Sequence, residues 1–244
     1  METSPILRSA RAALANEPRI DLAHRAIALA FDDGVVTVEG VVPDVGAKKL
    51  ALASIAATAG VHHIVDRLRA SPARQMSDAE VLEHLRAALE AEPVFQGCSV
   101  SASPGMVPPT RPERGSGGAG PGAGIEVGVR GGVVTLVGEV PSLVHKRLAG
   151  VLAWWIPGTT DVVNGLEVVP PEEDSDEDIT DAVRIVLEKD PLVDAADVGV
   201  IVRGGVVTLI GAVPSPAQRE MAEIDAWCVF AVDRVVNRLA VRPL

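Results

Sequence analysis

The chain of 244 residues contains no tyrosine, and aromatic residues make up only 2% of it. Because large aromatic side chains are scarce, a core has to be built from valine, leucine, isoleucine and alanine. Only two cysteines occur, Cys98 and Cys228, which excludes a disulfide framework and fits a reducing compartment. No apolar run approaches the roughly 18 residues of a membrane span, and no secretory signal opens the sequence. We therefore expect a cytoplasmic protein, either free or peripheral at the membrane.

Positive charge is also scarce. The formal net charge is −11, which disfavours binding to nucleic acid. The imbalance grows along the chain: residues 1–74 carry nine basic and eight acidic side chains, residues 75–169 carry six and ten, and residues 170–244 carry seven and fifteen. We expect no nucleic-acid partner, and only the first segment has no net repulsion from an anionic surface.

The motifs of common enzyme classes are missing as well. No GxSxG nucleophile elbow, HExxH zinc motif or Walker loop occurs. His62 and His63 form the only histidine pair, and apart from Asp66 no cysteine, aspartate or glutamate lies nearby at ligand spacing. The sequence therefore predicts no catalytic residue, no metal site and no cofactor, and we expect a protein that is not an enzyme.

The sequence does contain one phrase three times. RGGVVTLVGEVPS begins at Arg130, RGGVVTLIGAVPS begins at Arg203, and the looser DDGVVTVEGVVPD begins at Asp32. Upstream of each phrase an amphipathic segment ends at a proline, and downstream a second helical pattern leads to a β-branched run. Such self-similarity is typical of tandem modules. The predicted modules are residues 1–74, 75–169 and 170–244.

Each module predicts the order helix, strand, strand, helix, strand. Ser77 and Glu80 have the spacing of a capping box at the start of a helix. The two strands that follow flank a glycine turn, as in a hairpin. The predicted fold class is α+β: three tandem αββαβ modules, each with two helices packed on one face of a three-stranded mixed sheet.

Two sets of equivalent positions are predicted to be structural. A glycine interrupts the buried face of the second strand in every module, where we expect a helix to cross the sheet closely. A polar residue lies among the apolar residues of the last strand, where its side chain is expected to hold a loop or a backbone group. The two sets are Gly40, Gly138 and Gly211, and Asp66, Asn164 and Asn237.

The opposite face of the second strand is apolar in the second and third modules. Its residues are Val133, Thr135 and Val137, and Val206, Thr208 and Ile210. A small sheet with helices on one face normally shows polar residues on the other, as the first module does with Glu39. The two apolar stripes indicate that the two sheets pack on each other or that a partner covers them.

The pattern xGVVTLxGxVPS, followed by a helix and then VVNxL, resembles the BON module, which is named for bacterial osmotic-shock and nodulation-related proteins. All three modules resemble it, and the first departs in having Asp66 where the pattern has asparagine. The resemblance implies an αββαβ fold without a general catalytic motif. It also implies a binding function: attachment to membranes, phospholipid or other envelope components, small ions or ligands in some relatives, and a place in a stress response.

Basic and tryptophan side chains recur in the second helix of the modules. Cations near a helix N-terminus oppose its macrodipole, so they indicate an anionic partner such as a phospholipid headgroup, with solvated side chains as the alternative. Tryptophan there indicates a core or inter-module contact or a lipid anchor. The candidate binding residues are Lys48, Lys49, Lys146, Arg147 and Arg219, and Trp154, Trp155 and Trp227. Any membrane binding is expected to be weak and to come from Lys48 and Lys49.

Residues 99–124 form a Gly/Pro/Ser-rich insertion in the second module, and residues 170–178 form an acidic linker. Because the insertion cannot bury a core, we expect it to be flexible and dispensable. The whole pattern predicts a non-catalytic binding or scaffold protein that attaches to a protein partner or to an anionic phospholipid surface. The alternative is a small-ligand or ion sensor with its site between modules. Neither the partner nor the oligomeric state follows from the sequence.

Overall fold

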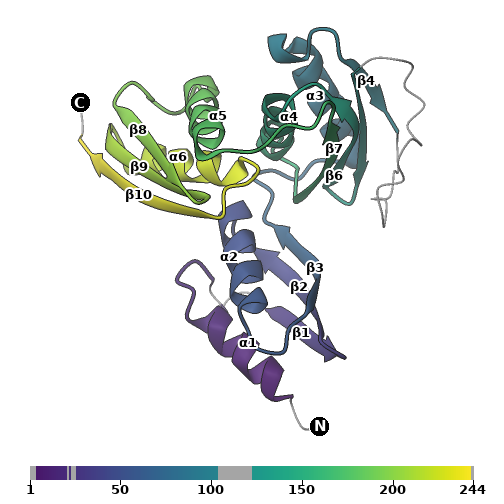
Figure 1. The fold of residues 1–244 in the computed structure, drawn as a ribbon, viewed down its shortest axis with the longest axis vertical. Coiled ribbons are helices and arrows are strands. Elements are labelled where there is room, and N and C mark those ends of the chain that lie inside the picture. The colour runs from purple at the N-terminus through teal and green to yellow at the C-terminus, as the bar shows by residue number, and fades with distance from the viewer. Residues whose placement is uncertain (1–3, 21, 23–25, 104–122, 243–244) are drawn as a thin grey trace. The chain divides into compact units, whose positions relative to one another are not determined.

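The computed structural model describes the whole chain apart from residues 1–3, 21, 23–25, 104–122 and 243–244 (Figure 1). The helices and strands repeat three times, and we call residues 1–74, 75–169 and 170–244 repeats 1, 2 and 3. The chain divides into two compact units, Met1–Ser71 and Pro72–Leu244. Repeat 1 supplies the first unit, and repeats 2 and 3 together supply the second.

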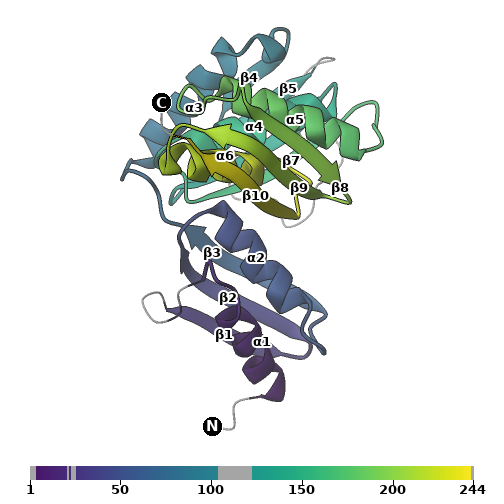
Figure 2. The ribbon, with the colours of Figure 1, turned by 90° about the vertical axis from the view of Figure 1, so that its left-hand side faces the viewer.

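Repeat 1 folds as a helix, a hairpin, a second helix and a third strand. Its elements are α1 (Pro5–Ala15), β1 (Ile27–Asp32), β2 (Val35–Val42), α2 (Val45–Ala56) and β3 (His63–Ala70). β2 lies in the middle of the sheet, antiparallel to β1 and parallel to β3. Both helices lie over one face of the sheet (Figure 2). The side chain of Asp44 caps α2 by accepting a hydrogen bond from the Ala47 amide at 2.8 Å.

Repeat 2 has the same order with one additional strand. Its elements are α3 (Asp78–Ala91), a 3-10 turn η1 (Pro93–Phe95), β4 (Ser99–Ala102), β5 (Gly124–Arg130), β6 (Val133–Val140), α4 (Leu143–Trp155) and β7 (Asp161–Val168). The capping box predicted for Ser77 and Glu80 is present at the start of α3. Valine, leucine and isoleucine side chains of both helices and the sheet form the core.

Repeat 3 closes the chain with the same three-stranded pattern. Its elements are α5 (Asp176–Lys189), β8 (Val198–Arg203), β9 (Val206–Val213), α6 (Pro216–Cys228) and β10 (Arg234–Val241). β9 is central, antiparallel to β8 and parallel to β10. The predicted α+β class and the αββαβ order are thus confirmed in all three repeats.

The insertion in repeat 2 differs from its prediction at its start. Ser99–Ala102 form β4, which pairs in parallel with β5 and widens this sheet to four strands. The insertion thus begins with a strand that is added at the edge of the predicted three-stranded sheet. The rest of the predicted flexible segment lies largely outside the described residues.

The glycines within the second strands have a different role from the predicted one. Gly40, Gly138 and Gly211 all have positive φ, at 156°, 127° and 113°. A Cβ on Gly40 would lie 2.7 Å from the carbonyl oxygen of Ala26, and a Cβ on Gly211 would collide with that of Asp197. The close neighbour is thus the backbone at the start of the adjacent strand rather than a crossing helix, and only glycine combines this φ with this approach.

Repeats 2 and 3 contact each other through helices. α4 contacts α5 and α6, and the three helices lie between the two sheets (Figure 1). Every residue of α4 from 147 to 153 is buried, because one side of this helix faces its own sheet and the other faces repeat 3. Of the two alternatives given for the apolar sheet faces of repeats 2 and 3, packing on each other within the chain is therefore not the one seen, and cover by a partner stays a prediction. These faces point away from the helical contact.

Candidate functional site

The polar residue of the last strand holds the second helix in each repeat. In repeat 2, the Asn164 side-chain amide donates to the Lys146 carbonyl at 2.7 Å. In repeat 3, the Asn237 amide donates to the Arg219 carbonyl at 2.8 Å. The side-chain oxygen of each asparagine also accepts from the amide two residues further along its own strand. In repeats 2 and 3 each asparagine therefore joins the second helix to the last strand through backbone groups.

Repeat 1 replaces this asparagine with Asp66, and its partner changes accordingly. The Lys48 ammonium lies 2.8 Å from the Asp66 carboxylate and donates to the Leu68 carbonyl at 3.0 Å. Lys48 is only 6% exposed. The lysine that was a candidate for membrane binding is therefore folded back onto β3 in this structure.

The other candidate cations of the second helices occupy varied environments. Arg147 is 2% exposed and pairs with Asp174, while its Nε and Nη1 have no hydrogen-bond partner among the described residues. Burial lowers the pKa of Lys146, whose ammonium lies 4.8 Å from the centre of the Phe230 ring. Lys49 is half-buried, and Arg219 is exposed and donates to the Asn237 carbonyl at 3.3 Å. Three of the five candidate cations thus contact groups within the protein. A phospholipid headgroup site at the second helices stays a prediction.

The tryptophans lie at or near the contact between repeats 2 and 3. Trp227 is fully buried in α6, and Trp154 and Trp155 are half-buried at the end of α4. The indole nitrogen of Trp155 donates to Asp225 at 2.9 Å across the two repeats. Of the two interpretations made from the sequence, Trp155 and Trp227 have the environment expected of a core or inter-module contact.

Asp225 is a fully buried carboxyl group in this contact. Burial raises its pKa to about 8, the hydrogen bond from Trp155 acts against this shift, and the nearby charge of Asp190 adds to it. Its Oδ2 has no hydrogen-bond partner among the described residues. The sequence contained a signal for its position: Ala222, Asp225 and Ala226 have the spacing of one helix face, and all three are buried.

Two further aspartates were missed by the sequence interpretation. Asp78 in α3 accepts hydrogen bonds from the amides of Gly131 and Gly132, both at 2.8 Å. Asp176 in α5 does the same for Gly204 and Gly205, at 2.7 and 3.2 Å. The available signal was the shared Ser-Asp dipeptide at the start of both helices. These carboxylates tie the first helix of each repeat to its hairpin turn.

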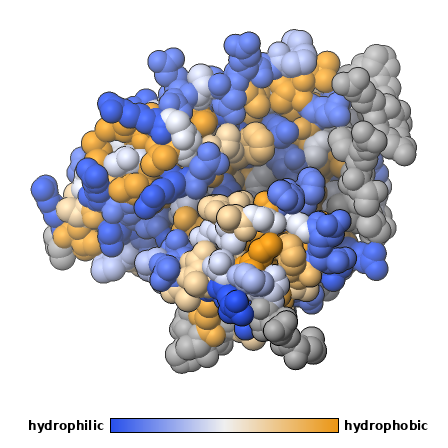
Figure 3. Space-filling model, turned by 60° about the horizontal axis from the view of Figure 1, so that its bottom comes forward, coloured by the Kyte–Doolittle hydropathy of each residue, from blue (hydrophilic) through white to orange (hydrophobic). Residues whose placement is uncertain are grey.

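The sheet surface of repeat 3 that faces away from its helices is apolar in its centre and basic at its sides. We call it the bare face of repeat 3. Its central residues are Ile201, Val206, Thr208, Ile210 and Val236. Ile201 is 45% exposed and Ile210 is 40% exposed. Figure 3 shows such apolar side chains among charged ones on the left, where repeat 3 lies.

Three arginines lie on this bare face. Strand pairing places Arg203 and Arg234 on either side of Val206, and it places Arg238 beside Ile210. All three are exposed, and none has an ion-pair partner within the described part of the chain. The surface therefore combines exposed isoleucine with positive charge in the most acidic third of the sequence.

The equivalent surface of repeat 2 is its bare face, with Val133, Thr135 and Val137 along β6. Thr135 is buried, whereas Val133 and Val137 are half-buried. The threefold repeat of the fold agrees with one comparison. A family model described as the BON domain matches residues 3–72, 116–170 and 175–243.

The chain belongs to the BON domain family. BON domains are in general non-catalytic binding domains, and BON proteins are typically associated with membranes or phospholipid. No curated protein matches this chain. Within the described residues, no helix has both the length and the apolar character needed to cross a bilayer.

The solved structures that are similar to this BON protein include two of CdsD, a structural protein of the type III secretion system of Chlamydia trachomatis. A structure of the CdsD C-terminal domain has 14% sequence identity and a TM-score of 0.25, with all of both chains covered. A second CdsD structure has 13% identity and a TM-score of 0.26, with 99% of this chain and 94% of that chain covered. At these low TM-scores, no conclusion about the BON repeats is drawn from the two structures.

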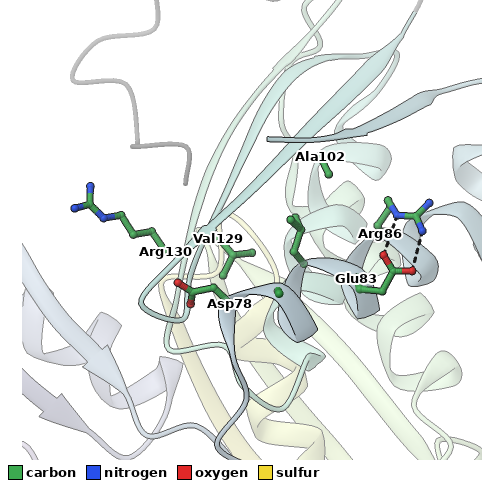
Figure 4. Close-up of a pocket in the computed structure, with 8 residues that line it drawn as sticks. Asp78, Glu83, Arg86, Ala102, Val129 and Arg130 are labelled. Atoms are coloured by element: carbon green, nitrogen blue, oxygen red, sulfur yellow. Dashed lines mark hydrogen bonds and ion pairs between the residues drawn. The ribbon is translucent and has the colours of Figure 1, made fainter. Parts of the chain in front are cut away.

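A surface hollow of about 550 Å³ lies in the second BON repeat, between α3 and the sheet (Figure 4). Three of the four charged groups that line it have partners. Asp78 binds the hairpin amides, and the Arg86 guanidinium is held by Glu83 at 2.8 Å and by Glu90 at 2.7 Å. Arg130 extends away to one side. The described residues contain no cluster of histidine, cysteine and carboxylate side chains suited to a metal ion.

Proposed function

We propose that this BON protein is a non-catalytic docking protein, and that the bare face of repeat 3 is its docking surface for an acidic partner protein. The observation that carries the proposal is the exposure of Ile201 and Ile210 at the centre of a sheet face bordered by Arg203, Arg234 and Arg238. Apolar area in the centre with charge at the rim is the arrangement of a protein interface.

The chemistry of the face supports a carboxylate-bearing protein surface. Covering the exposed part of each isoleucine contributes roughly 1 kcal/mol, since burial of a whole side chain contributes about 1.5–3 kcal/mol. Guanidinium groups match carboxylates in shape and can bind them with two parallel hydrogen bonds. The exposed arginines have no carboxylate partner within the described residues. An acidic partner protein would supply these carboxylates.

An anionic phospholipid surface is the second candidate, and the same three arginines favour it. Each cation near such a surface contributes about 1 kcal/mol. The protein partner is preferred because the cations first assigned to lipid are engaged elsewhere: Lys48 is paired with Asp66 and Arg147 with Asp174. The remaining alternative, a small-ligand site between modules, has no observation in its favour, because side chains such as Trp155 and Asp225 fill the contact between repeats 2 and 3.

A site-specific photocrosslinker in place of Ile201 tests the proposal in the native host. We expect a protein adduct at this position and none at Val65, which is similarly exposed on the sheet of repeat 1, at 41% against 45%. Flotation with phosphatidylglycerol vesicles tests the lipid candidate in parallel. Salt-sensitive flotation that Ile201→Glu abolishes assigns the face to phospholipid. The absence of both an adduct and flotation overturns the docking function of this face.

A further inference from the structure

The bare faces of repeats 2 and 3 share their centre and differ in what surrounds it. Val133, Thr135 and Val137 on β6 are equivalent to Val206, Thr208 and Ile210 on β9, because each set starts one residue after the hairpin glycine. Both sheets therefore carry an apolar stripe in the same place, although Thr135 at the centre of one stripe is buried and Thr208 at the centre of the other is half-buried. The residues beside the stripes are not alike.

Around the stripe of repeat 2 the charges are negative. Glu126 on β5 pairs laterally with Val137, and Glu139 follows two positions later on the same face of β6. Glu167 on β7 pairs with Glu139. In repeat 3 the positions of these three glutamates hold Gly199, Ala212 and Ala240. At its turn end, the face of repeat 2 also carries one exposed arginine, Arg130.

Around the stripe of repeat 3 the charges are positive. Arg238 replaces Gly165 of repeat 2, and Arg234 replaces Asp161. Arg203 matches Arg130. The two faces thus have similar apolar residues at equivalent positions and opposite charge around them. In repeat 1, by contrast, the charges of the equivalent face neutralise each other, since Arg67 lies 3.7 Å from Glu39.

The two complementary faces cannot meet within one chain. Repeats 2 and 3 contact each other through α4, α5 and α6, which lie on the opposite side of each sheet from its bare face. This contact includes the hydrogen bond of Trp155 to the buried Asp225 and the more exposed 2.9 Å ion pair of Lys189 with Glu92. Two copies of the chain are needed to bring one face of each kind together.

We infer that the acidic partner of the bare face of repeat 3 is the bare face of repeat 2 in a second copy of this chain. The inference rests on the docking role proposed for repeat 3 and adds the identity of the partner. The contact is head-to-tail, because two different surfaces of the chain take part. Each added copy leaves one face of each kind free, so assembly continues beyond the dimer unless it closes into a ring.

The size of the faces sets the strength of the contact. Strands about 4.8 Å apart with a rise of about 3.3 Å per residue make a face of roughly 15 by 25 Å. That is smaller than a standard stable interface, which buries about 800 Å² per partner. We therefore expect association that depends on concentration in the micromolar range. It is expected to weaken with salt, because the rim is charged and the Debye length falls from about 10 Å at 0.1 M to about 3 Å at 1 M.

Sedimentation velocity of the full chain tests the inference. Ile210→Glu places a negative charge in the centre of the repeat 3 face, and Val137→Glu does the same in repeat 2. Val65→Glu, on the sheet of repeat 1, is the matched control. We expect the parent and the control to associate at low salt and each of the other variants to remain monomeric. An equimolar mixture of Ile210→Glu and Val137→Glu is expected to form dimers of twice the monomer mass and nothing larger. In that mixture one intact face of each kind remains.

Arg238→Glu is a second variant, which changes the charge at the rim of the repeat 3 face rather than its apolar centre. Its exposed side chain should leave the fold intact and reduce association at least tenfold at low salt. A monomeric parent under all these conditions overturns the inference, as does a mixture that stays monomeric. Loss of association in Ile210→Glu but not in Val137→Glu would assign the contact to two copies of repeat 3 and would also overturn it. An adduct at Ile201 with a different protein leaves the proposed function standing while the self-association fails.

Discussion

Replacing Asp225 with asparagine removes a buried carboxyl group whose pKa is strongly raised. Asparagine keeps an oxygen that can accept the hydrogen bond from the Trp155 indole, which the parent makes at 2.9 Å. It has no proton to release, and it carries no charge toward Asp190. The substitution therefore separates the titration of this group from the packing of α4 against α6.

The magnitude follows from the difference between the folded and unfolded pKa of Asp225. Burial raises the folded pKa to about 8, whereas the ordinary value is 3.8. Between these values the folded state holds a proton that the unfolded state has released. The free energy of unfolding then falls by about 1.4 kcal/mol for each unit that the pH rises. From pH 5 to pH 7 the loss is about 3 kcal/mol, and it levels off above pH 8.

Urea unfolding followed by tryptophan fluorescence measures this effect in the full chain. All three tryptophans lie in the second unit, so the signal reports on repeats 2 and 3. We expect the stability difference between Asp225→Asn and the parent to grow in favour of the variant as the pH rises from 5 to 7. Asp181→Asn, which removes an exposed carboxylate from α5, is the control and should not change the slope. Parallel pH profiles for the parent and Asp225→Asn would refute the reasoning.

Two further substitutions test the local contacts of repeat 3, by the same unfolding assay. Asp176→Ala removes the acceptor of the Gly204 and Gly205 amides and should lower the free energy of unfolding by about 1–3 kcal/mol. An unchanged urea midpoint would show that water fully replaces these hydrogen bonds. Gly211→Ala should lower the free energy of unfolding more than Gly204→Ala does. Both glycines have positive φ, but only at Gly211 would a Cβ collide with backbone atoms. Equal losses would contradict the explanation from close backbone approach.

Most of the fold could be predicted because the repeats give each local signal three times. The helix starts at Asp44, Ser142 and Ser215 follow from cap residues placed after a proline, and all three caps are present. The glycines of the second strands were also predicted to be structural, but the reason why glycine is required there was not. A sequence does not reveal φ, so a glycine next to a strand backbone and a glycine beneath a helix give the same pattern.

The contact between repeats could not be predicted from the strand pattern alone. One expectation was that the exposed apolar strand faces pair within the chain. In the structure the two repeats contact each other through their helices instead, and α4 is buried from residue 147 to 153. Arg147 obscured the signal, since a charged residue in a helix usually marks its solvent face. Lys48 was likewise predicted to be a surface cation, because its pairing with Asp66 involves a strand residue 18 positions further along the chain. Buried polar partners of this kind become visible only when the elements are placed in space.

Cross-linking between copies tests the central claim most directly. Ile210→Cys and Val137→Cys would be made separately in a chain whose own Cys98 and Cys228 are replaced by alanine, and a short bismaleimide would be added to each and to their mixture. Docking of the repeat 3 face on the repeat 2 face predicts a cross-linked dimer in the mixture and none with either variant alone. Cross-linking of either variant with itself, or none in the mixture at concentrations where the parent associates, would contradict the account.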